Sequence, residues 1–292
     1  MLAALAGAAW LGAGAPARAS SPHDAGFVTS DGVRLHTLEA GPDDGARGAG
    51  TIVLVPGWAM PAWIWDRQLR ALSAHHRVVA LDPRGQGESD IPGDGYDQDR
   101  RGQDIAELIA TLGPRPVLLV GWSLGVLDSL AYVHGAGDAR LAGLVLVDNS
   151  VGEPPAPVAA RGEGRRPTRP ADRAAWMAGF VRSMFRRPME QAVLDRLTEA
   201  ALRLPRAAAA ALLRYDVPRE YWRAAVLSVR CPVLYAVTPR LAAQAQNLEA
   251  EDPLARAVVF PDAGHALFVD DAERFDAMMD GFMTHQVWPD GR

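Results

Sequence analysis

Lysine is absent from this chain of 292 residues, and cysteine occurs only once, at Cys231. A single cysteine excludes an intramolecular disulfide framework and a cysteine-based zinc site. All 30 basic residues are therefore arginines, and against 35 acidic residues they leave a net charge of −5. A mildly acidic chain of this kind argues against a general nucleic-acid binder, which needs a basic stripe or patch.

Long hydrophobic runs and phosphate-binding loops are missing as well. No run reaches the roughly 18 apolar residues of a membrane span. No G-x-G-x-x-G motif follows a predicted strand, which excludes the dinucleotide fingerprint. Acidic clusters at 43–44, 97–99, 249–252 and 270–271 have no His or Cys at ligand spacing and are expected to be solvated. We therefore expect neither a metal nor a cofactor.

The first residues have the composition of a targeting segment. Residues 2–15 are Ala, Leu, Gly and Trp, and Ala17-Arg18-Ala19 supplies a small-x-small cleavage site. This pattern predicts a signal peptide over 1–19 and hence a periplasmic or secreted protein. The alternative is an Ala-rich tail on a cytoplasmic protein, because no basic residue precedes the apolar run.

Predicted strands and helices alternate along most of the chain. Apolar runs typical of buried strands occupy 51–55, 77–81, 116–120, 144–147, 233–237 and 257–260, after a hairpin over 26–38. Helical patterns occupy 63–74, 103–112, 126–134 and 271–286. The alternation predicts an α/β fold with a mostly parallel sheet that helices cover on both faces.

One long segment has no strand pattern. Between 151 and 230, a linker rich in Pro and Arg over 161–170 precedes helical patterns at 171–185, 189–204 and 206–215. We predict a helical lid over 151–230, inserted between core segments 20–150 and 231–292. Trp176 and Phe180 lie at helical spacing within it. Such a face either packs onto the body or forms an apolar substrate-binding wall.

The same segment is rich in positive charge. It carries 15 arginines and 8 acidic residues, so the rest of the chain is strongly acidic. An arginine-rich lid over an acidic body predicts an anionic substrate or carrier. Solvated helix faces are the alternative explanation.

A candidate nucleophile lies between a predicted strand and a predicted helix. Gly121-Trp122-Ser123-Leu124-Gly125 is a G-x-S-x-G sequence, in which a sharp turn presents the serine at the start of the helix. We therefore expect Ser123 to be the nucleophile. The alternative is an ordinary glycine-rich turn that a serine caps.

A serine nucleophile needs a base, and His265 is the candidate. It follows the last predicted strand, in Ala263-Gly264-His265, so its loop lies at the same edge of the sheet as Ser123. The other histidines, His23, His36, His75, His76, His134 and His285, lie early in the chain, at helix ends or near the tail. We expect these to be surface residues.

Four motifs in this order resemble the α/β-hydrolase superfamily: Pro56-Gly57-Trp58, then Asp82-Pro83-Arg84-Gly85-Gln86-Gly87-Glu88-Ser89, then the Ser123 motif, then Gly264-His265. The resemblance implies an eight-stranded, mostly parallel sheet, a lid at the helical insertion and a Ser-acid-His triad. The Trp after Pro-Gly and the Gly-Trp-Ser-Leu-Gly elbow are similar to the carboxylesterase branch that includes the pimeloyl-acyl-carrier-protein methyl esterase.

The acid departs from the superfamily's common pattern. Many members carry it in the loop after the strand that matches 233–237, but here the loop over 238–248 has no carboxylate before Glu249. The other position used in the family is the end of the preceding strand, where Asp148 stands. The resemblance thus implies Asp148 as the acid, with Glu249 and Glu153 as alternatives. It also assigns the oxyanion-hole N–H groups to Trp58 and Leu124.

These residues together predict a serine hydrolase of small or medium carboxylic esters that works through an acyl-enzyme. Trp58, Trp122, Trp176 and Phe180 are expected to line the substrate site. Serine at the elbow disfavours the dehalogenase and epoxide-hydrolase branches, whose nucleophile is Asp. Lactonase, amidase, perhydrolase and carbon–carbon bond hydrolase share the triad and stay open. A non-catalytic ligand-binding protein of the same fold is the alternative from another class.

Overall fold

The computed structural model describes residues 21–42, 50–156 and 172–289, so the expected signal peptide and the 161–170 linker lie outside the described residues. The described chain forms an eight-stranded sheet in the order β1-β2-β4-β3-β5-β6-β7-β8. Its strands are β1 (His23–Val28), β2 (Arg34–Ala40), β3 (Thr51–Val55), β4 (Arg77–Asp82), β5 (Val117–Trp122), β6 (Leu141–Val147), β7 (Val233–Val237) and β8 (Ala255–Val259). Strand β2 runs antiparallel to both neighbours, and every other pair is parallel. The predicted α/β fold is confirmed.

The central strands are buried along their whole length. Every residue of β3, β5 and β7 is buried, as expected for runs of Val, Leu and Ile in strands with helices on both sides. Parallel direction brings the carboxyl ends of these strands to one edge of the sheet. That edge is where the predicted functional residues follow their strands.

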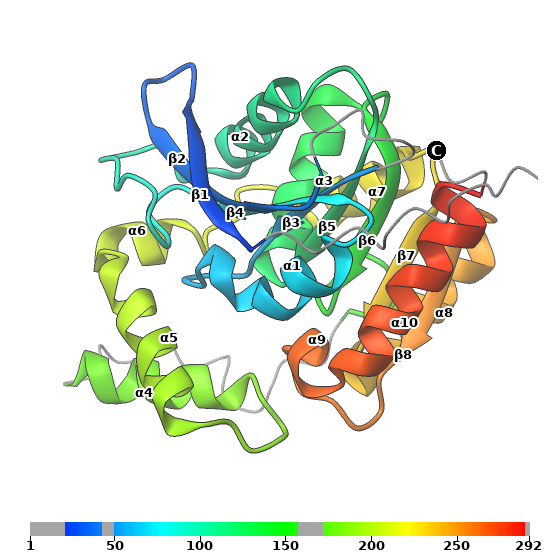
Figure 1. Cartoon of the computed structure of the whole chain (residues 1–292). Coiled ribbons are helices and arrows are strands. Elements are labelled where there is room, and N and C mark those ends of the chain that lie inside the picture. Colours follow the sequence, from blue (N-terminus) through cyan, green and yellow to red (C-terminus); the bar gives the residue numbers. More distant parts are fainter. Residues whose placement is uncertain (1–20, 43–49, 157–171, 290–292) are drawn as a thin grey trace, which may run out of the picture.

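Helices cover both faces of the sheet (Figure 1). Helices α2 (Gln98–Thr111), α3 (Leu124–Ala136) and α7 (Arg219–Ser228) pack together on one face, and α1 (Asp66–Leu72) contacts α10 (Ala272–Phe282) on the other. Helix α2 begins five residues before the predicted start, because the Asp97 side chain accepts the backbone N–H of Arg100 and caps it.

Two predicted helices are interrupted in the structure. The first comprises a 3₁₀ turn, η1 (Ala62–Trp65), followed by α1. The last, predicted over 271–286, is α10 followed by a short π-helix (Met283–Val287), and a separate short helix, α9 (Leu267–Asp270), precedes it.

Between β6 and β7 lie four helices of the described chain: α4 (Arg173–Ser183), α5 (Gln191–Arg203), α6 (Arg206–Ala211) and α7. The first three match the predicted helices of the insertion, whereas α7 was not predicted. Helices α4 and α5 pack on each other beyond the edge of the sheet (Figure 1).

The expectation of a loop over 238–248 is wrong. The structure has a 3₁₀ turn, η2 (Pro239–Leu241), and then α8 (Ala242–Glu251). Alanine and glutamine in this segment favour helix, and Pro239 is tolerated because it lies in the first turn.

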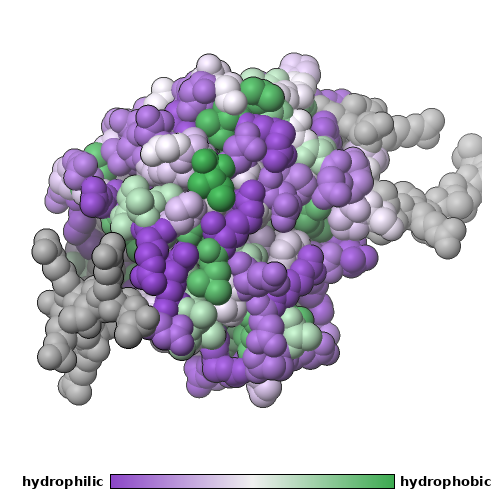
Figure 2. All heavy atoms as spheres, turned by 90° about the vertical axis from the view of Figure 1, so that its left-hand side faces the viewer, coloured by the Kyte–Doolittle hydropathy of each residue, from purple (hydrophilic) through white to green (hydrophobic). Residues whose placement is uncertain are grey.

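The outer surface is mixed in polarity. The face that carries the β1–β2 hairpin is mostly hydrophilic, with small separate hydrophobic patches (Figure 2), which is normal for a protein surface. Among the described residues, no helix combines the length and the hydropathy that a membrane span requires.

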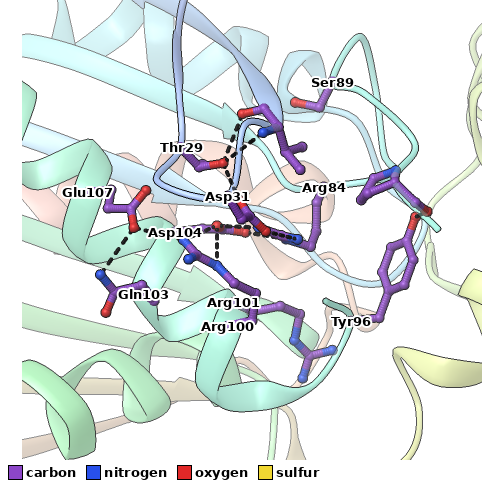
Figure 3. A network of polar contacts seen from close by, with 12 residues as sticks. Thr29, Asp31, Arg84, Ser89, Tyr96, Arg100, Arg101, Gln103, Asp104 and Glu107 are labelled. Carbon is purple, nitrogen blue, oxygen red and sulfur yellow. Dashed lines mark hydrogen bonds and ion pairs between the residues drawn. The ribbon is translucent and has the colours of Figure 1, made fainter. Parts of the chain in front are cut away.

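A buried arginine holds one end of the sheet to its covering helix (Figure 3). Arg84, which follows β4, has no exposed side-chain surface. Its Nε and Nη2 donate to the two carboxylate oxygens of Asp104 on α2 at 2.6 and 2.7 Å, and its Nη1 donates to Asp31 in the β1–β2 turn at 3.0 Å. Burial would raise the pKa of Asp31, but hydrogen bonds from Arg84 and Thr29 lower it to about 2.

Replacing Arg84 by methionine is expected to lower the free energy of unfolding by about 3–5 kcal/mol, because it leaves Asp104 buried without its main partner. Urea unfolding at pH 7 measures the change. Arg70→Ala is the control, since Arg70 pairs with Asp66 on the exposed side of α1, and it should leave the midpoint nearly unchanged. Equal midpoints for Arg84→Met and the wild type would contradict a structural role for this network.

Candidate active site

Ser123 occupies a strained turn between β5 and α3. Its backbone has φ 55° and ψ −117°, a left-handed conformation that non-glycine residues rarely adopt. The turn is possible because its flanking glycines have no Cβ: one at Gly121 would lie 2.2 Å from the Gly125 oxygen, and one at Gly125 would lie 2.4 Å from the Val55 oxygen. The Ser123 N–H donates to the Val147 oxygen at 2.9 Å, which ties the turn to β6.

Three predicted residues meet at the carboxyl edge of the sheet. The Nε2 atom of His265 lies 2.8 Å from Ser123 Oγ, and its Nδ1 lies 2.7 Å from Asp148 Oδ2. The His265 side chain is 29% exposed and that of Asp148 is 2% exposed. In this hydrogen-bonded series, solvent therefore reaches the histidine but not the carboxylate. In this arrangement the imidazole can take the serine proton while the carboxylate stabilises the resulting imidazolium.

Asp148 is held ionised by its neighbours. Burial alone would raise its pKa, but the hydrogen bond and charge of His265, together with hydrogen bonds from Thr238, lower it. Both the backbone N–H and the hydroxyl of Thr238 donate to Asp148 Oδ1 at 2.8 Å. The other carboxylate oxygen, Oδ2, is the one that accepts the Nδ1–H of His265 and so orients the ring.

The two alternative acids lie elsewhere. Glu249 accepts the backbone N–H of Ala257 in β8 at 3.2 Å. Glu153 is 1% exposed and pairs with Arg223 at 3.0 Å, and its burial raises its pKa. Neither makes a hydrogen bond with His265 in the described part of the chain. The described residues also contain no group of three or more His, Cys, Asp or Glu side chains that could hold a metal ion.

Two backbone donors flank Ser123. The loop after β3 passes so close that a Cβ on Gly57 would lie 2.9 Å from the Ser123 Cβ. The next residue is Trp58, and Leu124 begins α3 directly after the serine. Within the described residues, neither Trp58 N–H nor Leu124 N–H makes a hydrogen bond. Both are therefore available to a negatively charged oxygen at the start of a helix, where anions are stabilised.

Three of the four predicted substrate-binding aromatics form one cluster. The Trp58 ring meets Phe180 edge-on at 5.1 Å and Trp176 at 6.2 Å, and the last two rings stack at 5.8 Å. Trp176 is 41% exposed. The Trp58 indole also donates to the Ala209 carbonyl of α6 at 2.9 Å. The insertion thus contacts the loop that carries the Trp58 donor.

Trp122 does not belong to that cluster, and its predicted contact with substrate is wrong. Its side chain is fully buried and packs edge-on against Phe268 in the core. The indole N–H donates to the His265 carbonyl at 2.9 Å. Because side chains alternate along β5, the Trp122 side chain lies in the core on one face of the sheet. From there it contacts the loop that carries His265.

Asp270, which was expected to be solvated, is instead 4% exposed. Its carboxylate accepts backbone N–H groups from Gly264 at 2.7 Å, Arg186 at 2.8 Å and Arg187 at 3.1 Å. One side chain thus joins the histidine loop to the segment between α4 and α5. The sequence alone did not distinguish Asp270 from Asp271, because such contacts depend on how the insertion packs.

Many arginines of the insertion are occupied by contacts with the body. Arg203 donates to the Ser89 carbonyl at 2.9 Å and Arg186 to the Pro261 carbonyl at 3.0 Å. The Arg196 guanidinium lies 4.1 Å above the Trp63 ring. These contacts assign structural roles to several arginines, and the expected anionic substrate or carrier stays a prediction.

Comparisons with known proteins agree with this geometry. The model of the alpha/beta hydrolase family matches residues 52–278. The structure superposes with a TM-score of 0.76 on a candidate aryl esterase from Burkholderia cenocepacia, at 26% identity over 89% of this chain and 97% of the other.

Two curated relatives match part of the chain. A non-heme chloroperoxidase of Streptomyces lividans is 38% identical over 121 residues, and a bifunctional esterase/perhydrolase of Acinetobacter calcoaceticus is 36% identical over 124 residues. These matches span 41% and 42% of this chain and 42% and 44% of the two relatives.

If Asp148 orients His265, Asp148→Asn should slow the reaction of Ser123 with a fluorophosphonate about 10³- to 10⁴-fold, because the ring then adopts the wrong tautomer. The labelling rate at pH 7.5 measures this. Glu249→Gln, which alters the rival carboxylate, should label at the wild-type rate. Slow labelling of Glu249→Gln together with normal labelling of Asp148→Asn would reverse the assignment.

Proposed function

This chain belongs to the α/β hydrolase family, and we propose that it is a serine hydrolase of small or medium carboxylic esters. The observation that carries the proposal is the hydrogen-bonded series Ser123–His265–Asp148 beside two backbone N–H groups that have no partner among the described residues. The esterase names of the Burkholderia and Acinetobacter relatives support the ester as the bond that is cleaved.

The first half-reaction acylates the serine. Ser123 Oγ attacks the ester carbonyl while His265 Nε2 takes the hydroxyl proton. The carbonyl electron pair moves onto oxygen, and the N–H groups of Trp58 and Leu124 donate to it; each such donor typically contributes about 3 kcal/mol to the transition state. His265 then gives its proton to the leaving alkoxide, and the acyl group stays on Ser123.

The second half-reaction releases the acid. Water enters, loses a proton to His265 Nε2 and attacks the acyl carbon through the same oxyanion geometry. Collapse breaks the bond to Ser123 Oγ, which takes the proton back. Asp148 keeps its charge throughout and stabilises the imidazolium twice in each cycle.

The insertion supplies the substrate wall in this proposal. We assign Trp58, Trp176 and Phe180 to contacts with the apolar part of the ester, with α4–α6 acting as the lid. The exposed surface of Trp176 and its stacking on Phe180 support this assignment, because a flat apolar group can extend the stack.

Ser123→Ala should lower kcat/KM for p-nitrophenyl acetate by at least about 10⁴-fold and abolish fluorophosphonate labelling, because no other group on the site replaces the nucleophile. Ser228→Ala is the matched control: that hydroxyl donates to the Ala225 carbonyl of α7 and should not affect either measurement. Esterase activity that survives intact in Ser123→Ala would overturn the proposal.

Substitution of the aromatic wall should change substrate binding more than chemistry. We expect Trp176→Ala and Phe180→Ala each to raise KM for phenyl acetate about 3- to 10-fold, with kcat within about twofold, because each removes one ring contact. Tyr215→Ala, an exposed aromatic elsewhere in the insertion, should leave KM unchanged. Equal KM values in all three variants would place the substrate elsewhere.

Perhydrolysis is the second candidate activity, and the relatives favour it specifically. The Acinetobacter relative is both an esterase and a perhydrolase, and the Streptomyces relative is a non-heme chloroperoxidase. Hydrogen peroxide would take the place of water in the second half-reaction and leave with the acyl group as a peracid. Peracid formed from an acetate ester and peroxide, absent in Ser123→Ala, separates this activity from simple hydrolysis.

A further inference from the structure

Gln86 is a buried side chain that the proposed reaction does not use. It lies in the loop after β4 and is 2% exposed. Its Oε1 accepts the backbone N–H of Ala59 at 2.6 Å, and its Nε2 lies 3.2 Å from the Gly57 oxygen and 3.3 Å from the Met60 oxygen. Both ends of the amide are therefore directed at one short turn, residues 57–60.

That turn carries the Trp58 donor, and its backbone is strained. Ala59 has φ 60°, in the left-handed region that a non-glycine residue adopts only when its surroundings enforce it. Besides Gln86, the turn is closed by the Met60 N–H, which donates to the Gly57 oxygen at 3.2 Å. Gln86 occupies polar groups on either side of Trp58 but not the Trp58 N–H, which makes no hydrogen bond in the part of the chain that the structure describes.

Gln86 is itself fixed to the body of the protein. Its N–H donates to the Pro83 oxygen at 2.9 Å, and its carbonyl accepts the Ser89 N–H at 3.1 Å. The neighbouring Asp82 accepts the N–H groups of Glu88 in this loop and of Ala62 just beyond the 57–60 turn. These bonds fix the backbone of Gln86, and therefore the position of its side-chain amide, relative to the body of the protein.

We propose that Gln86 is a positioning residue for the oxyanion hole: its amide sets the 57–60 turn so that the Trp58 N–H is directed at the oxyanion formed beside Ser123. This inference rests on the proposed hydrolase function. A donor that is misdirected weakens binding of the transition state more than binding of the neutral ester, so kcat falls while KM changes little.

The role requires an acceptor and a donor in one side chain. Glutamine provides a carbonyl oxygen and an NH₂ group. An ionised carboxylate of the same shape could still accept from Ala59 but could not donate to Gly57 or Met60. A protonated carboxyl group could do both.

The main test is Gln86→Met, which keeps the length of the side chain and removes its three side-chain hydrogen bonds. We expect kcat for p-nitrophenyl acetate to fall about 10- to 100-fold, with KM within about threefold. A trifluoromethyl ketone forms a hemiketal with Ser123 whose oxyanion occupies the same hole. Its Ki should rise by the factor by which kcat/KM falls, while the affinity for acetate, the product, stays unchanged.

A matched control separates this effect from a loss of stability. Gln68 is 1% exposed, and its Nε2 donates to the Phe268 oxygen at 3.1 Å and to Asp276 at 2.9 Å. Gln68→Ala should lower the unfolding midpoint and leave kcat and Ki within about twofold. Gln86→Met should change kcat and Ki even at temperatures where both variants are fully folded.

Gln86→Glu provides a second measurement that does not depend on the methionine variant folding. Its kcat relative to the wild type should rise as pH falls through the pKa of the introduced carboxyl group, because only the protonated form can also donate. A ratio independent of pH between 5 and 9, or kcat of Gln86→Met within threefold of the wild type, would overturn the role of Gln86. Intact activity in Ser123→Ala, measured in parallel, would instead overturn the proposed function and this role with it.

Discussion

The pairing of Trp122 with Val147, at the ends of the parallel strands β5 and β6, places the serine and the carboxylate of the site side by side. The residues that follow this pair are Ser123 and Asp148, and both leave their strands with positive φ, 55° and 48°. The Ser123 N–H donates to the Val147 oxygen and the Asp148 N–H to the Ala236 oxygen of β7. Because side chains alternate along a strand, a slip of one residue in this register would turn the carboxylate away from His265.

Buried carboxylates organise the loops around this edge. Asp82 at the end of β4 accepts the N–H groups of Ala62 and Glu88, Asp148 after β6 accepts that of Thr238, and Asp270 accepts three more. Backbone amides thus satisfy charges that would otherwise be costly to bury. The fixed loops can then present catalytic groups without rearrangement during the reaction.

Patterns of local chemistry account for the parts of the fold that the sequence predicted correctly, since the buried strands were visible as apolar runs. Ser123 and His265 were chosen as motif residues at strand ends, and the structure brings them within 2.8 Å of each other; their catalytic roles stay predictions. Asp148 needed the family resemblance as well, and the hydrogen bond to His265 agrees with it. The errors concern residues whose environment depends on packing: Trp122 alternates into the core, Asp270 is covered by the insertion, and 242–251 is a helix whose buried face contains only Gln244, Ala245 and Leu248.

Several arginines of the insertion make structural contacts that the composition alone did not indicate. Guanidinium groups that suggested a charged surface donate instead to carbonyl oxygens of the body, as Arg203 does to Ser89. Arginine suits this use because its guanidinium group carries five N–H donors that can reach backbone carbonyl oxygens, and it stays charged at any physiological pH. A count of charges could not reveal these contacts, since it contains no information on what each charge touches.

The indole of Trp58 donates to the Ala209 carbonyl of α6, while its backbone N–H makes no hydrogen bond within the described residues. One residue therefore belongs to both the cover and the chemistry. Any displacement of α6 from the body would break this bond or shift the Trp58 ring with it. The packing of the insertion and the position of the 57–60 turn are therefore coupled through a single side chain.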